Sequence, residues 1–248
     1  MKLIDVFNQL TTSELSQNFI GGSEEGQITE ANYPKVVNHI NLGLTALYKR
    51  FYLKEGRVPL TMVAGRSIYP IHSKYAVSNM KSREPVRYLQ DTVTDKFTDN
   101  IFKIEAVLTD AEKELALNDV LDPLSITTTS PTTLRIPTAL VAQGPDLPDH
   151  YKTSQLTIVY RANHPLIDAT APVFFPEQIE LELPESHLEA LLLFVASRAN
   201  TPGGLVNEFN AGNNYASKYE MECLRLEQFN LQIDHNTSNH RLIRNGWV

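Results

Sequence analysis

Hydrophobic residues recur at helical spacing near the N-terminus, in two separate series. Leu3, Phe7 and Leu10 are spaced for one face of a helix, and Gly21-Gly-Ser23 marks a loop after them. Asn32, with Pro34 two residues later, predicts the start of a second helix, and Gly56 predicts its end. The apolar positions of this second helix are Val36, Val37, Ile40, Leu44, Leu47 and Phe51.

Helical spacing returns in the last third of the chain. After Pro184, one helix carries an apolar stripe, and the break at 200–204 ends it. A second helix has a seam that alternates steps of three and four, which favours packing within the chain or, alternatively, a contact between subunits. The stripe is Leu188, Leu191, Leu192, Val195 and Ala199, and the seam is Phe209, Gly212, Ala216, Tyr219, Cys223, Leu226, Asn230 and Ile233.

Alternation of apolar and polar residues replaces helical spacing in the middle of the chain. In 101–108 the pattern places Phe102, Ile104, Ala106 and Leu108 on one face of a strand. The same alternation predicts strands at 133–136, 155–160 and 179–183, while 73–99 is polar, weakly patterned and expected to be a long loop.

These patterns predict an α+β protein with a divided helical bundle. The bundle is expected from residues 1–57 and 184–234, and residues 58–183 are expected to form an inserted antiparallel β sandwich or open barrel. Residues 235–248 are expected to be an extended C-terminal arm.

The composition is that of an ordinary globular protein with an acidic balance. The 248 residues are 42% hydrophobic and 21% charged, with a net charge of −7 and a single cysteine. This charge argues against general binding of nucleic acid or of anionic membranes, which requires a basic surface. No signal-peptide segment or membrane-spanning run is present, so we expect a product of a reducing cytoplasm without a membrane anchor.

No sequence motif specifies catalysis, a cofactor or a metal. The seven histidines lack zinc-ligand spacing, and Gly-rich phosphate loops and nucleophile elbows are missing from the sequence. Glu180 and Glu182 share one face of a predicted strand, whereas a glycosidase needs two carboxylates that face each other across a sugar, so we expect both to be solvated. Cys223 is expected to be a small buried hydrophobe.

The last eight residues are unusual for a terminal segment. They hold the single Trp, two arginines and no acid, and they follow a polar stretch from Asp234 to His240. An indole gains free energy from burial, so this segment either folds back on its own domain or docks on a neighbouring chain. The residues expected to make that contact are Arg241, Leu242, Ile243, Arg244, Asn245, Trp247 and Val248.

Several segments together resemble the head-to-tail adaptor (connector) proteins of tailed bacteriophages, especially those of short-tailed phages. The similar segments are 38–51 with 53–55, 190–200, 207–215, 219–227 and the tail 241–248; 99–105 and 117–119 match more loosely. Residues 73–98 and 140–150 carry no recognised pattern.

This resemblance implies a structural virion protein at the portal–tail junction, assembled in the bacterial host cytoplasm. It implies a ring, usually twelvefold, that binds the portal protein through the arm, contacts the tail nozzle or fibres through the β part, and passes DNA at ejection. Candidate subunit contacts are Phe209, Asn213, Asn214 and Tyr215.

Two other functions remain compatible with the sequence. One is a cell-wall (peptidoglycan) hydrolase associated with the phage tail, for which Glu180 and Glu182 are the first residues to test. The other is a cytosolic regulatory protein whose arm binds an intracellular partner.

Overall fold

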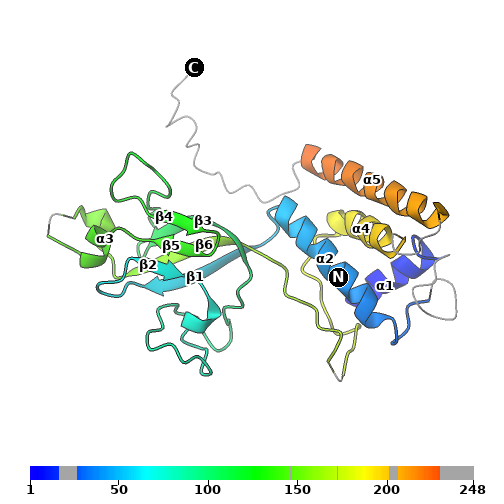
Figure 1. Cartoon of the computed structure of the whole chain (residues 1–248), viewed down its shortest axis with the longest axis horizontal. Helices are drawn as coiled ribbons and strands as arrows, with labels where there is room; N and C mark the ends of the chain where they lie inside the picture. The colour runs from blue at the N-terminus through cyan, green and yellow to red at the C-terminus, as the bar shows by residue number, and fades with distance from the viewer. Residues whose placement is uncertain (17–26, 146, 172, 201–205, 230–248) are drawn as a thin grey trace, which may run out of the picture. The chain divides into compact units, whose positions relative to one another are not determined.

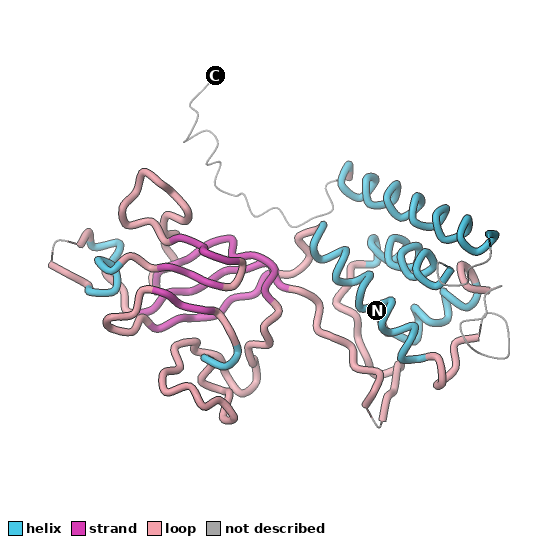
Figure 2. The backbone as a smooth tube through the Cα atoms, viewed as in Figure 1, coloured by secondary structure: helices cyan, strands magenta, loops and turns pink. Residues whose placement is uncertain are grey.

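The computed structural model describes residues 1–16, 27–145, 147–171, 173–200 and 206–229. These residues form two compact units, one helical, from Met1–Leu53 and His164–Val248, and one rich in β-strand, from Lys54–Asn163. Figures 1 and 2 show the strands gathered in the second unit, together with short helices, and the longer helices in the first. The predicted α+β class is therefore confirmed.

The helical unit is organised around one central helix. This helix, α4, contacts α1, α2 and α5, and it is buried over more of its circumference than the predicted stripe because Ala190, Leu193 and Ala196 are also buried. Gly43 of α2 permits this close packing, since a Cβ there would lie 2.7 Å from the Leu191 side chain. The helices of the unit are α1 (Leu3–Thr12), α2 (Tyr33–Arg50), η3 (Glu185–His187), α4 (Leu188–Asn200) and α5 (Val206–Gln228).

The start of α2 agrees with the sequence, but its end does not. Asn32 is the N-cap residue and Pro34 lies in the first turn. The helix ends at Arg50, and Gly56 lies inside strand β1 (Glu55–Thr61). The prediction of Gly56 as a helix stop was wrong because this glycine makes room for an aromatic ring, and a Cβ at Gly56 would lie 2.3 Å from Tyr160.

Six strands form two three-stranded antiparallel sheets in the described part of the β unit. The strand orders are β1-β6-β3 and β2-β5-β4, and neither sheet closes into a barrel. Both sheets contribute side chains to one hydrophobic core. The remaining elements are β2 (Ile68–Pro70), η1 (Ser73–Tyr75), β3 (Ile101–Thr109), β4 (Thr127–Ser130), β5 (Thr133–Arg135), α3 (Thr138–Ala142), η2 (Asp149–Tyr151) and β6 (Gln155–Ala162).

Strand β3 departs from the alternation expected from its sequence. The predicted buried face was Phe102, Ile104, Ala106 and Leu108, whereas Ile101, Ile104 and Val107 are the buried apolar residues. Two register irregularities against β6 explain the difference, because each extra residue turns the side chains that follow toward the other face.

The segment 73–99 is a loop, as predicted, but a well-anchored one. Tyr75, Tyr88 and Leu89 are buried in the core of the β unit. The Arg66 guanidinium carbon lies 5.2 Å and 4.7 Å from the ring centroids of Tyr75 and Tyr88, which adds cation–π attraction to their burial.

Residues 164–183 belong to the helical unit and not to the β-rich part in which the sequence places them. The expected strand at 179–183 is an extended segment with one bridge between Lys2 and Glu180. Leu181 and Leu183 are buried, and Leu181 N donates to Met1 O, so alternation reflects burial against the N-terminus and not a sheet.

Candidate binding surface

The predicted contact residues lie on α5 or outside the described residues. Asn213 and Asn214 are exposed and Tyr215 is half-buried. The backbone of Phe209 lies in α5, and its side chain is outside the described part of the structure. All seven predicted arm residues, from Arg241 to Val248, are also outside the described residues.

The seam of α5 packs against α4, which is the intrachain alternative. Tyr219, Cys223 and Leu226 are buried, and the Tyr219 ring packs edge-on against Phe194 with centroids 5.3 Å apart. Ala216 is exposed, contrary to the predicted seam. Because the seam is covered, a partner would have to meet another face of α5.

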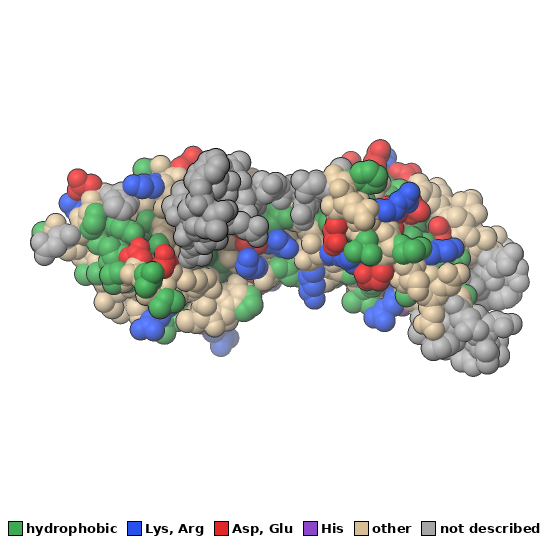
Figure 3. Space-filling view, turned by 90° about the horizontal axis from the view of Figure 1, so that it is seen from above, with side chains coloured by type: hydrophobic (Ala, Val, Ile, Leu, Met, Phe, Trp, Pro, Cys, Tyr) green, Lys and Arg blue, Asp and Glu red, His purple; other side chains and the backbone are tan. Residues whose placement is uncertain are grey.

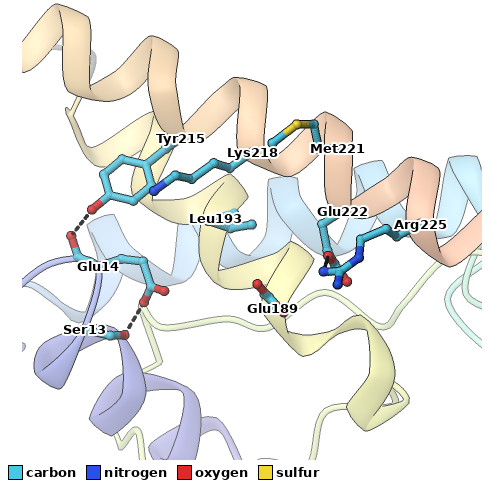
Figure 4. A pocket seen from close by; sticks show the side chains of 9 residues that line it. All are labelled: Ser13, Glu14, Glu189, Leu193, Tyr215, Lys218, Met221, Glu222 and Arg225. Atoms are coloured by element: carbon cyan, nitrogen blue, oxygen red, sulfur yellow. Dashed lines mark hydrogen bonds and ion pairs between the residues drawn. The ribbon is translucent and has the colours of Figure 1, made fainter.

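A groove runs beside Tyr215 between α5, α4 and the end of α1 (Figure 4). Its volume is about 670 Å³, and its wall combines three carboxylates and two cations with apolar side chains. The lining residues are Ser13, Glu14, Glu189, Leu193, Tyr215, Lys218, Met221, Glu222 and Arg225.

Tyr215 closes one end of this groove. Its hydroxyl donates to the Glu14 main-chain oxygen at 3.3 Å, and the Lys218 ammonium lies 5.5 Å from the centre of its ring. Burial raises the pKa of Tyr215, and the Glu14 charge adds to this effect. The phenol therefore stays protonated at neutral pH and acts as a hydrogen-bond donor.

An ion pair lies toward the other end of the groove. Arg225 Nη1 lies 2.8 Å from Glu222 Oε2, and the Glu222 side chain is 13% exposed. This carboxylate is therefore already paired within α5. The hydrogen bond to Glu222 raises the pKa of Arg225 above its usual value. Met221, 61% exposed, provides apolar area for a partner, and the groove as a whole offers binding chemistry of mixed polarity.

The residues considered for catalysis are in ordinary environments. Glu180 and Glu182 are exposed and alternate with buried leucines on the extended segment. Cys223 is buried, and burial raises the pKa of its thiol. Among the described residues, no group of three or more His, Cys, Asp or Glu side chains could hold a metal ion, and no helix is long and apolar enough to cross a membrane.

The sequence did not predict a pair of ion pairs, called the Arg50 clamp from here on, that joins α2 to α5. Arg50, at the end of α2, pairs with Glu220 at 2.6 Å and with Glu227 at 2.7 Å on α5. The arginine side chain is 24% exposed. More than 160 residues separate the partners, so no local pattern could have revealed this contact.

Acid should destabilise the helical unit through His187, which is buried, and His39, which is half-buried. Burial lowers the pKa of His187 below its usual 6.5, and burial together with Lys35 and Arg198 lowers that of His39. The unfolded chain then binds more protons below about pH 6.5, so stability is lost as the pH falls through that value.

Urea denaturation at about pH 7.5 and about pH 5.5 tests this effect. In His187→Phe the pH dependence should be smaller, because the titrating group is gone while the edge-on contact with Phe51 is retained. If the unfolding free energy of His187→Phe falls between the two pH values as much as that of the wild type, other groups cause the pH dependence.

Comparison with models of known protein families found no match, and comparison with curated proteins found no similar sequence.

Proposed function

We propose that the protein is a head-to-tail adaptor of a tailed bacteriophage. It would be a structural virion protein that forms a ring, usually twelvefold in such adaptors, beneath the portal protein. It would form part of the DNA ejection channel and act through shape and binding, without a reaction.

The observation that carries this proposal is where the adaptor-like segments lie in the fold. The similar segments 38–51, 190–200, 207–215 and 219–227 make up most of α2, α4 and α5, which pack as one bundle although the segments are spread along the sequence. The Arg50 clamp joins the first segment to the last through Glu220 and Glu227. This joint packing supports a common structural role for the similar segments rather than separate chance matches.

The proposed role divides the chain into three parts. The helical bundle meets the portal, with residues 235–248 as an extended arm, and the exposed side of α5 at Asn213, Asn214 and Tyr215 faces a neighbouring subunit. The two sheets of the β unit form a sandwich that faces the tail nozzle or fibres. The net charge of −7 suits a channel through which DNA passes without being held, because phosphate binding grows with each Lys or Arg contact.

Mass measurement of the protein, alone and mixed with purified portal rings, tests this function. The free subunit should be mainly monomeric, since most of its large apolar side chains are buried within its own units. The mixture should give one discrete species of high mass. A stable dimer that does not bind the portal would contradict the proposal and favour a regulatory binding protein.

A further inference from the structure

Two aliphatic side chains at the tip of the connection between β3 and β4 are almost wholly exposed. Val120 is 97% exposed and Leu121 is 93% exposed. Single exposed aliphatic residues are common, but two adjacent ones on one tip form a small apolar feature that gains free energy when it is covered.

The tip is held in place by hydrogen bonds and does not fold back over these side chains. The Asp119 amide donates to Ser125 Oγ at 2.8 Å, and the Leu121 amide donates to Asp119 Oδ1 at 3.0 Å. The Tyr151 hydroxyl donates to Asp122 Oδ2 at 3.1 Å. The two side chains are therefore presented in a fixed position, which lowers the entropy cost of binding.

The connection that carries this tip is rich in acidic residues, and Asp119 and Asp122 directly flank Val120 and Leu121 in the sequence. Residues 110–122, called the acidic tip from here on, carry five carboxylates and one lysine. The carboxylates are Asp110, Glu112, Glu114, Asp119 and Asp122. Figure 3 shows acidic and hydrophobic side chains intermingled over the β unit in the view from above. A surface that covers this tip should be apolar at its centre and basic around it.

A surface of that kind exists on the same unit. Residues 74–87, called the basic loop from here on, carry four cations and one acid, Glu84. Their exposed apolar residues include Met80, 85% exposed, and Val77, 41% exposed. The cations are Lys74, Lys81, Arg83 and Arg87.

The basic loop is also preorganised. The Asp91 carboxylate accepts hydrogen bonds from the amides of Ser78 at 2.8 Å and Phe97 at 3.0 Å and from the Ser78 hydroxyl. Burial raises the pKa of Asp91, but the hydrogen bonds from the Ser78 hydroxyl and from the two amides outweigh it, so the pKa is lowered. The Val77 amide donates to Leu89 O at 3.0 Å. Hydrogen bonds within the β unit therefore hold both the acidic tip and the basic loop in place before binding.

The acidic tip and the basic loop project from opposite sides of the β unit. In Figure 1 the acidic tip lies above the sheets and the basic loop lies below them. They cannot cover each other within one copy. We propose that the acidic tip of one subunit docks on the basic loop of the next. Such a contact joins unlike surfaces, so it repeats from copy to copy and closes into a ring when the rotation permits.

This inference rests on the proposed ring, but it can be tested without the portal. Two variants, Val120→Cys and Met80→Cys, are mixed and treated with a short bismaleimide cross-linker; wild type is the control, because its cysteine is buried. The mixture should give several-fold more dimer than either variant alone, with the bridge joining positions 120 and 80. Equal yields in all three samples, or no bridge between these positions, would overturn the proposal.

A second set of variants separates association from folding. Val120→Ser with Leu121→Ser is placed on a chain that also carries Asp119→Cys and is mixed with the Met80→Cys chain. This mixture should give about tenfold less cross-link than Asp119→Cys without the serines mixed with the same partner, which corresponds to about 1.4 kcal/mol. The melting temperature should not change, since both side chains are exposed.

Leu166→Ser is the matched control, because Leu166 is 81% exposed and belongs to the helical unit, whereas both surfaces belong to the β unit. Lys81→Glu with Arg83→Glu should also weaken association, and added salt should weaken it further in the wild type. If the serine variant cross-links as well as this control, the tip is not the contact.

Portal binding distinguishes the two proposals. The serine variant should still bind the portal through its arm, without the bridge between neighbours. If the Val120→Cys and Met80→Cys subunits cross-link with each other but neither they nor the wild type bind the portal, the adaptor function is contradicted and the contact between copies stands.

Discussion

Deletion of residues 235–248 should abolish portal binding and leave the melting temperature of the chain nearly unchanged. The polar stretch from Asp234 to His240 has no apolar side chain to offset the entropy cost of ordering. The segment after it has Trp247, Leu242 and Ile243, which gain free energy only against a surface that receives them. Binding to immobilised portal and a thermal melt of the truncated chain measure the two effects.

A single substitution should reproduce most of this loss. Trp247→Ala should cost about 2 kcal/mol or more per arm if the indole fills a pocket on the portal, and several arms per ring would multiply the loss. Thr237→Ala, in the polar stretch, is the matched control and should bind normally. Unfolding of the truncated chain would instead show that the tail belongs to the subunit's own core, which is the other interpretation of this segment.

Gly56→Ala should destabilise the β unit by about 1–3 kcal/mol through overpacking. Gly56 is paired with Tyr160 across β1 and β6, and a Cβ would lie 2.3 Å from its ring. The ring is 5% exposed and packs edge-on against Phe97, so it has little room to move. Urea denaturation of wild type and variant measures the loss.

Gly144→Ala is the matched control for this substitution. No heavy atom lies within 4 Å of a Cβ built at Gly144, and the glycine has no positive φ that a side chain would strain. The control should keep wild-type stability. Equal stability of both variants would mean that the Tyr160 ring moves aside at no cost.

For the helical unit, local pattern was enough to predict the main elements. The Asn32 and Pro34 pair marked the start of α2, and the positions of Leu3, Phe7 and Leu10 predicted the buried side of α1. These predictions succeeded because helix caps and helical faces depend on residues within a few turns of each other.

For the groove on α5, the sequence predicted only some of the residues that line it. It singled out Tyr215, which the structure places at the edge of the groove. The opposite wall comes from Glu14 and Glu189, on segments far away in the chain. The sequence also could not predict that Val120 and Leu121 are exposed, because burial of an aliphatic residue in a loop depends on what packs over it.

The sequence by itself determined where the helices lie, which of their faces are apolar, and that a β-rich part is inserted between them. Only the tertiary structure decided that Gly56 makes room for the Tyr160 ring and that the register of β3 against β6 shifts at two points. It also decided that the segment 179–183 pairs with the N-terminus. The reason is physical: helical periodicity is a property of neighbours in the chain, whereas strand register, close approach and ion pairs such as that of Arg50 depend on residues brought together only by folding.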